Sequence, residues 1–400
     1  MGFFIQNLIN KNDMSKSEII NRINLLKEKI EKNNDSIDTK NVTQLALKLM
    51  INSAYGAISS RSNPMGDDDL ANAITDMGST SIQKINDIAI DFVKQWRSKH
   101  NMKNLYEADY KKCLVFNDTD SAGVSLDLCG VHMFDGDRIT NEGYDLIEKF
   151  SNFVNEEFEK WYKKTTNSKD CRLYFKREKV CDAGLYLEKG GSEEEAKKNY
   201  VLHILDDEGV KHPKFKYTGV KFAKSIIPTA LKDAGKKIVE HMILSNDRCS
   251  TDKLVQDLYK QYCEMPLDDR SSLQRCNNIE KWIDRTNADG YRLGTPGHVR
   301  AAIRYNNALK DLNIKKYKPI ESGENAKIVF VEKNNKYGID KIAYNEAWPE
   351  EFEKVFTIDT RTGFEKLIYD EIKRFYKSMK WPAFNPAQNY EFSLYDILGI

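Results

Sequence analysis

The chain has 400 residues, of which 40% are hydrophobic and 11% aromatic. Because one hydrophobic core rarely extends to this length, we expect two or three packed units. It contains 62 Lys and Arg residues and 61 Asp and Glu residues, which gives a net charge of +1. This balance excludes a uniformly basic protein that coats nucleic acid, although it permits local basic patches.

Seven cysteines form no Cys-x-x-Cys pair and no zinc-finger spacing, so neither a disulfide framework nor a structural zinc ion is indicated. No apolar run approaches the roughly 20 residues that are needed to span a bilayer. The opening segment MGFFIQNLINKND also lacks the pattern of an export signal. We therefore expect a soluble cytoplasmic protein that makes no contact with membranes.

Helical periodicity dominates the start of the chain. Residues 16–33 carry apolar side chains at helical spacing, and a second helix pattern begins near Thr43, after a polar stretch at 33–39. These two patterns predict an antiparallel helical hairpin within the first sixty residues. A further long helix is expected over residues 70–97.

Patterns typical of strands follow. Residues 112–128 predict a strand, a tight turn and a second strand, and alternation returns over 172–205. Beyond Pro228 the pattern is mostly helical, with a short strand patch at 327–332 and a final helix near 362–379. The expected fold class is therefore α+β.

Two carboxylates occupy the tip of the hairpin predicted at 112–128. Asp118 and Asp120 lie two residues apart in a polar turn, between an apolar run and an alternating strand. Mg²⁺ prefers oxygen ligands, and two-metal phosphoryl transfer needs carboxylates on a rigid element. Asp and Ser also populate ordinary turns, and Asp-x-Asp turns serve nucleotide-sugar transferases, so this motif alone leaves the reaction open.

An upstream helix carries a polar stripe. Lys48, Asn52 and Tyr55 are spaced i, i+4 and i+7, which places an ammonium, an amide and a phenol on one side of a helix. A lysine there can neutralise triphosphate charge, a tyrosine can monitor a base pair, and Gly56 permits close approach. An amphipathic helix with a polar edge would show the same spacing.

Together these segments resemble a known family. Residues 48–56 (KLMINSAYG) look like motif B of family B DNA polymerases, and 117–121 (NDTDS) look like motif C. Residues 71–78 are similar to the helix that links the two motifs, and 294–300 (GTPGHVR) are similar to a thumb segment of the T-even bacteriophage branch. The resemblance spans nearly the entire chain, and a phage origin would imply the cytoplasm of the host cell.

The resemblance implies DNA-directed DNA synthesis from dNTPs on primer–template DNA. It assigns catalysis and the binding of two Mg²⁺ ions to Asp118 and Asp120, with Glu178 as a further metal ligand. Nucleotide binding falls to Lys48, Asn52, Tyr55 and Gly56. Contacts with the primer–template duplex fall to Lys197, Lys198, Tyr200, Lys221, His298 and Arg300.

Six lysines between positions 197 and 224 are interleaved with aromatic residues, as expected of a surface that follows phosphates without reading bases. They are Lys197, Lys198, Lys214, Lys216, Lys221 and Lys224, and the aromatic residues are Tyr200, Phe215, Tyr217 and Phe222. A solvated charged face would look the same from sequence alone. Asn199 stands where the family's KKRY element has arginine, which removes one cation from this surface.

The resemblance also divides the chain into domains. Fingers are expected at 1–58, palm at 59–225, thumb at 226–388 and a C-terminal tail at 389–400. In that tail Leu394, Ile397 and Leu398 fall at i, i+3 and i+4, which makes one apolar patch from a single turn. The family's phage members end in a similar peptide that docks on the sliding clamp, although this turn could instead pack on the thumb.

Motif A, which supplies another catalytic aspartate, has no counterpart in the sequence, and neither does the exonuclease. We therefore expect one part of a split polymerase, whose partner chain carries motif A and the exonuclease and shares the two Mg²⁺ ions. An excised fragment would give the same sequence. The alternative function is a catalytically inactive, DNA-binding and clamp-tethering subunit derived from a polymerase.

Overall fold

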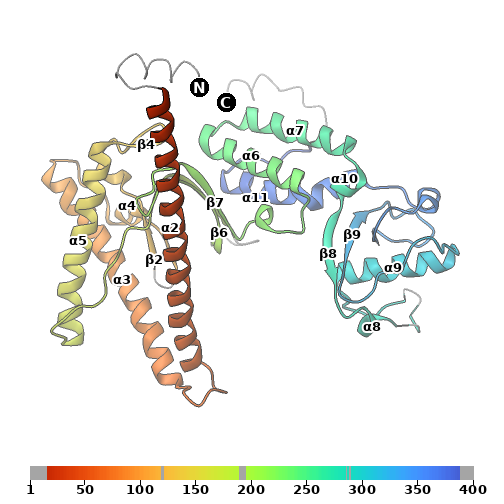
Figure 1. Ribbon diagram of the computed structural model, residues 1–400, viewed down its shortest axis with the longest axis horizontal. Coiled ribbons are helices and arrows are strands. Elements are labelled where there is room, and N and C mark those ends of the chain that lie inside the picture. Colours follow the sequence, from red (N-terminus) through yellow and green to blue (C-terminus); the bar gives the residue numbers. More distant parts are fainter. Residues whose placement is uncertain (1–15, 119–120, 189–194, 285, 288–289, 388–400) are drawn as a thin grey trace. The chain divides into compact units, whose positions relative to one another are not determined.

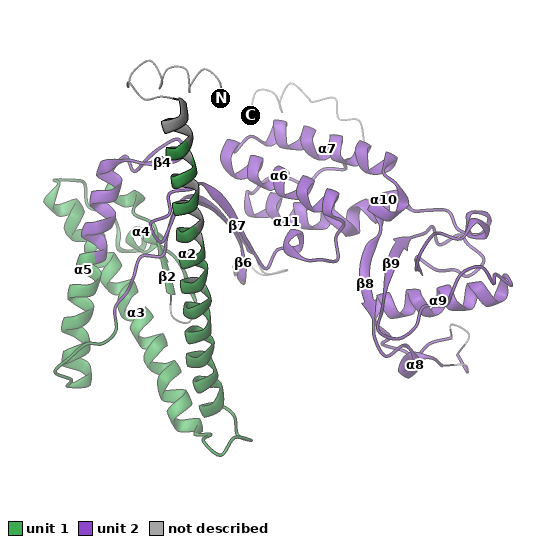
Figure 2. Ribbon diagram, viewed as in Figure 1, with its two compact units in different colours: residues 1–130, 152–173 green, residues 131–151, 174–400 purple. Residues whose placement is uncertain are grey.

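The computed structural model describes residues 16–118, 121–188, 195–284, 286–287 and 290–387 (Figure 1). The chain divides into two compact units, coloured separately in Figure 2. Unit 1 comprises residues 1–130 and 152–173, and unit 2 comprises residues 131–151 and 174–400. Helices and antiparallel sheets occur in both described units, which confirms the expected α+β class.

Unit 1 is built around helix α3 (Asp68–Lys99). Asp67 caps this helix by accepting a hydrogen bond from the Leu70 backbone N–H at 2.9 Å, and acidic residues follow in the first turn. The buried face of α3 recurs at helical spacing through Ile82, Ile85, Ala89, Phe92 and Val93. The other elements of this unit are α2 (Lys16–Ile58), α4 (Glu107–Tyr110), β1 (Leu114–Asp118), β2 (Ser121–Val124) and part of α5 (Asn141–Thr166).

The structure differs from the expected helical hairpin, because α2 is one continuous helix of 43 residues. The polar stretch at 33–39 contains no Gly or Pro, and its Asn, Asp, Ser and Thr residues each cost less than about 0.7 kcal/mol in a helix. Thr39 and Thr43 also donate their hydroxyls to the backbone carbonyls four residues earlier, at 2.8 and 2.9 Å. No helix among the described residues is both long and apolar enough to cross a membrane.

Unit 2 contains two cores. The first lies where helices cover the antiparallel sheet β5-β6-β7, and its fully buried residues include Val201, Phe222, Leu231 and Phe375. Its strands are β5 (Lys179–Glu188), β6 (Glu195–Asp207) and β7 (Lys214–Thr218). Its helices are α6 (Thr229–Ser245), α7 (Arg248–Glu264), α10 (Thr360–Phe364), the π-helical turn η6 (Glu365–Tyr369) and α11 (Asp370–Ser378). A small ribbon of β3 (Phe134–Asp135) and β4 (Arg138–Ile139) also belongs to this unit.

The second core of unit 2 lies between helix α9 (Gly297–Asp311) and a three-stranded sheet in the order β10-β9-β8. These strands are β8 (Ser272–Cys276), β9 (Glu324–Phe330) and β10 (Lys341–Tyr344), and α8 (Ile279–Trp282) precedes α9. The strand patch predicted at 327–332 overlaps β9, whereas β8 and β10 were not expected after Pro228 and are a correction. Five residues of β8 form too short a segment for periodicity to distinguish a strand from a helix.

Tyr376→Phe is expected to lower the free energy of unfolding by about 1–3 kcal/mol. The Tyr376 hydroxyl donates to the buried carboxylate of Asp252, which would lose that donor. Urea unfolding of the full chain measures the change. Tyr106→Phe is the matched control, because its side chain is 85% exposed, and equal effects of the two substitutions would contradict the prediction.

Candidate active site

The carboxylate turn lies at the tip of an antiparallel hairpin made by β1 and β2. Asp118 pairs with Ser121 at the end of the ladder, and the Ser121 hydroxyl donates to the Asp118 carbonyl oxygen at 3.2 Å. Asp118 is half-buried at the end of β1. Asp120 lies outside the described residues.

Helix α3 holds the segments on either side of this hairpin. Arg97, a buried residue of α3, donates to the carbonyl oxygen of Leu128 at 2.7 Å and to that of Lys103 at 2.6 Å. Trp96 donates its indole N–H to the Cys129 carbonyl oxygen at 3.1 Å. Burial raises the pKa of the Cys129 thiol to about 12, so this cysteine stays protonated and serves packing rather than chemistry.

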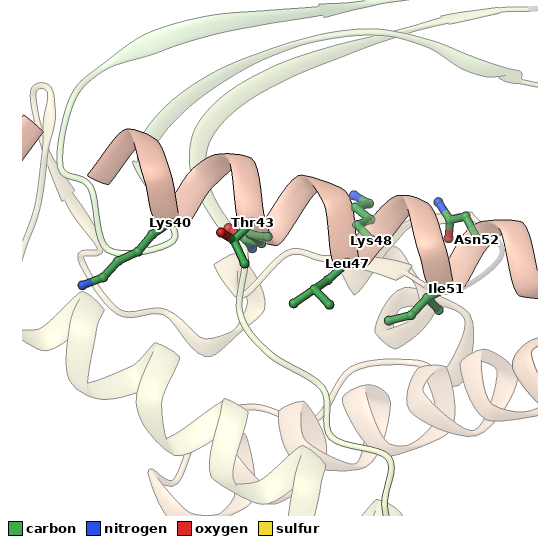
Figure 3. Close-up of a pocket in the computed structure, with 7 residues that line it drawn as sticks. Lys40, Thr43, Leu47, Lys48, Ile51 and Asn52 are labelled. Atoms are coloured by element: carbon green, nitrogen blue, oxygen red, sulfur yellow. The ribbon is translucent and has the colours of Figure 1, made fainter. Parts of the chain in front are cut away.

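The predicted polar stripe of α2 forms one wall of a depression of about 530 Å³ (Figure 3). Lys48 and Asn52 both line it, and Figure 3 shows Leu47 and Ile51 projecting together from an adjoining side of the helix. The depression is lined by Lys40, Thr43, Gln44, Leu47, Lys48, Ile51 and Asn52. An ammonium and an amide on an open, mainly apolar wall can bind a charged molecule that also presents a flat face.

Tyr55 and Gly56 follow the depression in the last turns of α2. Tyr55 is not among the residues that line the depression, and its side chain is 37% exposed. A Cβ placed on Gly56 would meet no atom within 4 Å. The space beside Gly56 is therefore open in unit 1, which is compatible with the expected close approach of another molecule.

Glu178 lies at the start of β5, beside a network of charges in unit 2. Its carbonyl oxygen accepts the Glu208 N–H at 2.6 Å, and its carboxylate is 3.5 Å from the Lys179 ammonium. The Glu178 side chain is exposed, so it could reach a ligand in solution. Its neighbour in sequence, Arg177, pairs with the carboxylate of Asp206 on β6.

Asp206 is the buried centre of that network, with a side chain only 1% exposed. The Arg177 guanidinium lies 2.8 Å from its carboxylate, the Gly209 N–H donates to it at 2.7 Å, and the Tyr144 hydroxyl donates at 3.3 Å. Burial alone would raise the pKa of Asp206, but these donors and the positive charge of Arg177 outweigh burial and lower it. Sequence reasoning missed this residue, because the partners are separated by up to 62 positions.

Asp206→Asn is expected to lower the free energy of unfolding by about 1–3 kcal/mol at pH 7, because Arg177 loses its charged acceptor. The pKa of Asp206 is lower in the folded chain, so its stabilisation is present above about pH 4 and is lost as the pH falls through the folded value.

Urea unfolding at pH 7, 5 and 3.5 measures this change, and the difference between wild type and Asp206→Asn should narrow at the lowest pH. Asp137→Asn, at an exposed turn of the same unit, should show little difference at any of these values. A difference for Asp206→Asn that is constant with pH would contradict the role of the ionised carboxylate.

Lys198 and Tyr200 lie on β6, and the backbone of the strand is unusual there. Lys198 is exposed and has a φ of +61°. The facing Gly219, with a φ of +67°, approaches so closely that a Cβ there would collide with the Lys198 carbonyl oxygen. The Tyr200 ring packs 5.4 Å from that of Tyr186. The side chain of Lys197 lies outside the described residues.

Lys221, predicted to contact DNA, is engaged in bonds within unit 2. Its ammonium donates to the carbonyl oxygen of Lys366, and its backbone N–H donates to the buried Glu371 carboxylate at 2.7 Å. Burial lowers the pKa of the Lys221 amine. Because these bonds tie the end of β7 to the C-terminal helices, the geometry favours a structural link over a phosphate contact.

His298 and Arg300 lie in the first turn of α9. Burial lowers the pKa of His298, so its ring is neutral at pH 7. The guanidinium carbons of Arg300 and Arg304 lie 5.9 and 5.0 Å from the centre of the Tyr291 ring. Sequence reasoning missed Arg304, although it stands four residues after Arg300 on the same helical face.

The described residues contain no group of three or more His, Cys, Asp or Glu side chains placed to hold a metal ion. Asp118 offers hard oxygen ligands at the end of β1, so its chemistry suits Mg²⁺. The expected ligand set would thus need donors beyond the described part of this chain. The apolar patch of Leu394, Ile397 and Leu398 also lies outside the described residues.

Residues 17–170 match the family model described as DNA polymerase family B. The chain is 27% identical over 316 residues to a DNA-directed DNA polymerase of Escherichia phage RB69, which covers 76% of the chain and 33% of the phage protein. It is 25% identical over 336 residues to that of Enterobacteria phage T4, which covers 82% of the chain and 35% of the phage protein.

These matches support the identification of the chain as a portion of a family B DNA polymerase of the T4-like type. It spans about a third of the length of the curated relatives that it matches.

Proposed function

We propose that the chain is the C-terminal part of a DNA-directed DNA polymerase and catalyses nucleotidyl transfer together with a partner polypeptide. The 3′-hydroxyl of a primer would attack the α-phosphate of a dNTP and release pyrophosphate. The observation that carries this proposal is the hairpin of β1 and β2, which holds Asp118 at its tip within the stretch that matches the family model.

Each residue of the site has a role that follows from its chemistry. Asp118, with Asp120, would hold two Mg²⁺ ions, which supply charge neutralisation for the attacking and leaving oxygens. Lys48 would place its ammonium against the triphosphate as a point charge. Asn52 and Tyr55 would line the nascent base pair from the same side of α2. Glu178 would offer a further carboxylate.

The surface of α2 supports the need for a partner polypeptide. Val42, Leu45 and Leu49 form an apolar ridge on one side of the polar stripe, and Leu47 and Ile51 form another. Each of these side chains is at least 55% exposed in this chain. A helix with apolar residues on several sides is normally enclosed by other protein. The partner proposed to supply motif A and the exonuclease would cover this surface.

Primer extension by the isolated chain and by its complex with that partner tests the proposal. The isolated chain should extend a primer only weakly, because its set of carboxylates is incomplete. The complex should extend it, and Asp118→Asn in the complex should reduce kcat by roughly a hundredfold or more, as loss of a charge-stabilising group does. Full activity of the isolated chain would refute the split site, and full activity of the variant would refute the role of Asp118.

Duplex binding depends in this proposal on cations such as Lys198, Arg300 and Arg304. Lys198→Gln should weaken primer–template binding and reduce the slope of log K against log salt concentration by about 0.9, the value for one lost phosphate contact. Fluorescence anisotropy at several salt concentrations measures the slope.

Lys221→Gln is the matched control for this measurement. It should leave the slope unchanged and lower the urea midpoint, because its amine is engaged inside unit 2. If Lys221→Gln reduced the slope and Lys198→Gln left it unchanged, the phosphate contact would belong to Lys221 rather than to Lys198. Docking of Leu394, Ile397 and Leu398 on a sliding clamp belongs to the same proposal.

A further inference from the structure

The face of the hairpin that carries Asp118 has an uneven composition. Side chains alternate along a strand, so Phe116 and Asp118 emerge from the same face of β1. Their paired positions on β2 are Gly123 and Ser121, which lie on that face as well. One aromatic ring therefore stands next to the carboxylate and opposite a residue that has no side chain.

The ring of Phe116 occupies the space that a side chain at position 123 would need. A Cβ built on Gly123 would collide with Cδ1 and Cε1 of Phe116 and would lie 3.1 Å from Cζ. The ring thus lies across the backbone of Gly123. A glycine inside a strand costs conformational entropy and has nothing of its own to pack, and here the ring supplies the missing cover.

If the Phe116 ring were displaced, the Asp118 carboxylate would move as well, because the two residues are close on the same strand. Asp118 follows Phe116 by two residues on the same strand and face. The ladder shifts its register between Leu114 and Phe116, so the strand is already irregular just before the ring. Beyond Phe116, regular pairing continues to Asp118 and Ser121. A shift at Phe116 therefore has only this short stretch of ladder in which to be absorbed.

We infer that Gly123 is a positioning residue for Asp118: by leaving room for the Phe116 ring, it sets the position of Asp118 at the end of β1. This inference rests on the proposed nucleotidyl transfer. It explains why the smallest residue stands opposite the largest side chain on the face that carries the metal-binding group. A side chain at 123 would push the ring along this face and shift Asp118.

Gly123→Ala tests the inference. In the complex with the partner polypeptide, the variant should show a kcat lower by roughly tenfold to a hundredfold, as expected for a misplacement of about 1 Å. Its KM for dNTP and its affinity for primer–template DNA should remain within about twofold, because these depend on other elements. The Mg²⁺ concentration for half-maximal rate should rise. The double variant Phe116→Leu with Gly123→Ala should restore kcat, because the smaller leucine side chain leaves room for the added methyl group.

A control variant separates positioning from a general loss of stability. Gly184→Ala introduces a Cβ on β5 that would meet Cδ2 of the cross-strand Leu202 at 2.6 Å. It should lower the urea midpoint but leave kcat and the Mg²⁺ dependence unchanged. Normal kcat in Gly123→Ala, or no recovery in the double variant, would overturn the inference.

A titration of the isolated chain with Mn²⁺, followed by electron paramagnetic resonance, examines the turn without the partner. Gly123→Ala should weaken the binding that Asp118→Asn abolishes, and the double variant should recover it. If the wild-type complex does not extend primers but this titration behaves as described, the proposed function fails and the positioning role stands. If the complex is active and Gly123→Ala matches wild type in both measurements, only the positioning role fails.

Discussion

The chemistry proposed for this chain depends on holding the Asp118 carboxylate rigidly at the end of β1. A two-stranded hairpin is too weak to provide such rigidity alone. Arg97 of α3 adds support, because this buried cation donates to the carbonyl oxygens of Leu128 and Lys103 and so joins the flanks of the hairpin to α3. In the proposed chemistry, the position of Asp118 would thus depend on a residue that carries no catalytic group.

In unit 2 a buried charged side chain also joins distant segments, but there it is a carboxylate instead of a guanidinium. The carboxylate of Asp206 pairs with Arg177 and accepts hydrogen bonds from Tyr144 and the Gly209 N–H. These contacts lie near Glu178, which directly precedes β5. Lys221 and Glu371 similarly join the end of the sheet to the C-terminal helices. Buried charges are stable only when they are fully paired, so each network fixes the backbone of several distant segments at once.

Helix α2, in contrast, leaves apolar side chains exposed to solvent. The apolar ridges of α2 remain exposed although they flank Lys48 and Asn52, the residues proposed to meet the nucleotide. The chain spans about a third of its phage relatives, and the helix with the most exposed apolar surface is also the one that lines the candidate site. Enclosure of this helix and completion of the carboxylate set would therefore be one event, since the same partner would provide both.

The sequence by itself determined the α+β class, the carboxylate hairpin and the stripe of Lys48 and Asn52, because period and local spacing are properties of short segments. Only the tertiary structure decided that 33–39 continue α2, since weak helix formers without Gly or Pro are compatible with either state. It also decided the strand at β8, the internal role of Lys221 and the ring of Phe116 over Gly123. These features depend on contacts between residues that are distant in sequence, and local sequence patterns do not specify such contacts.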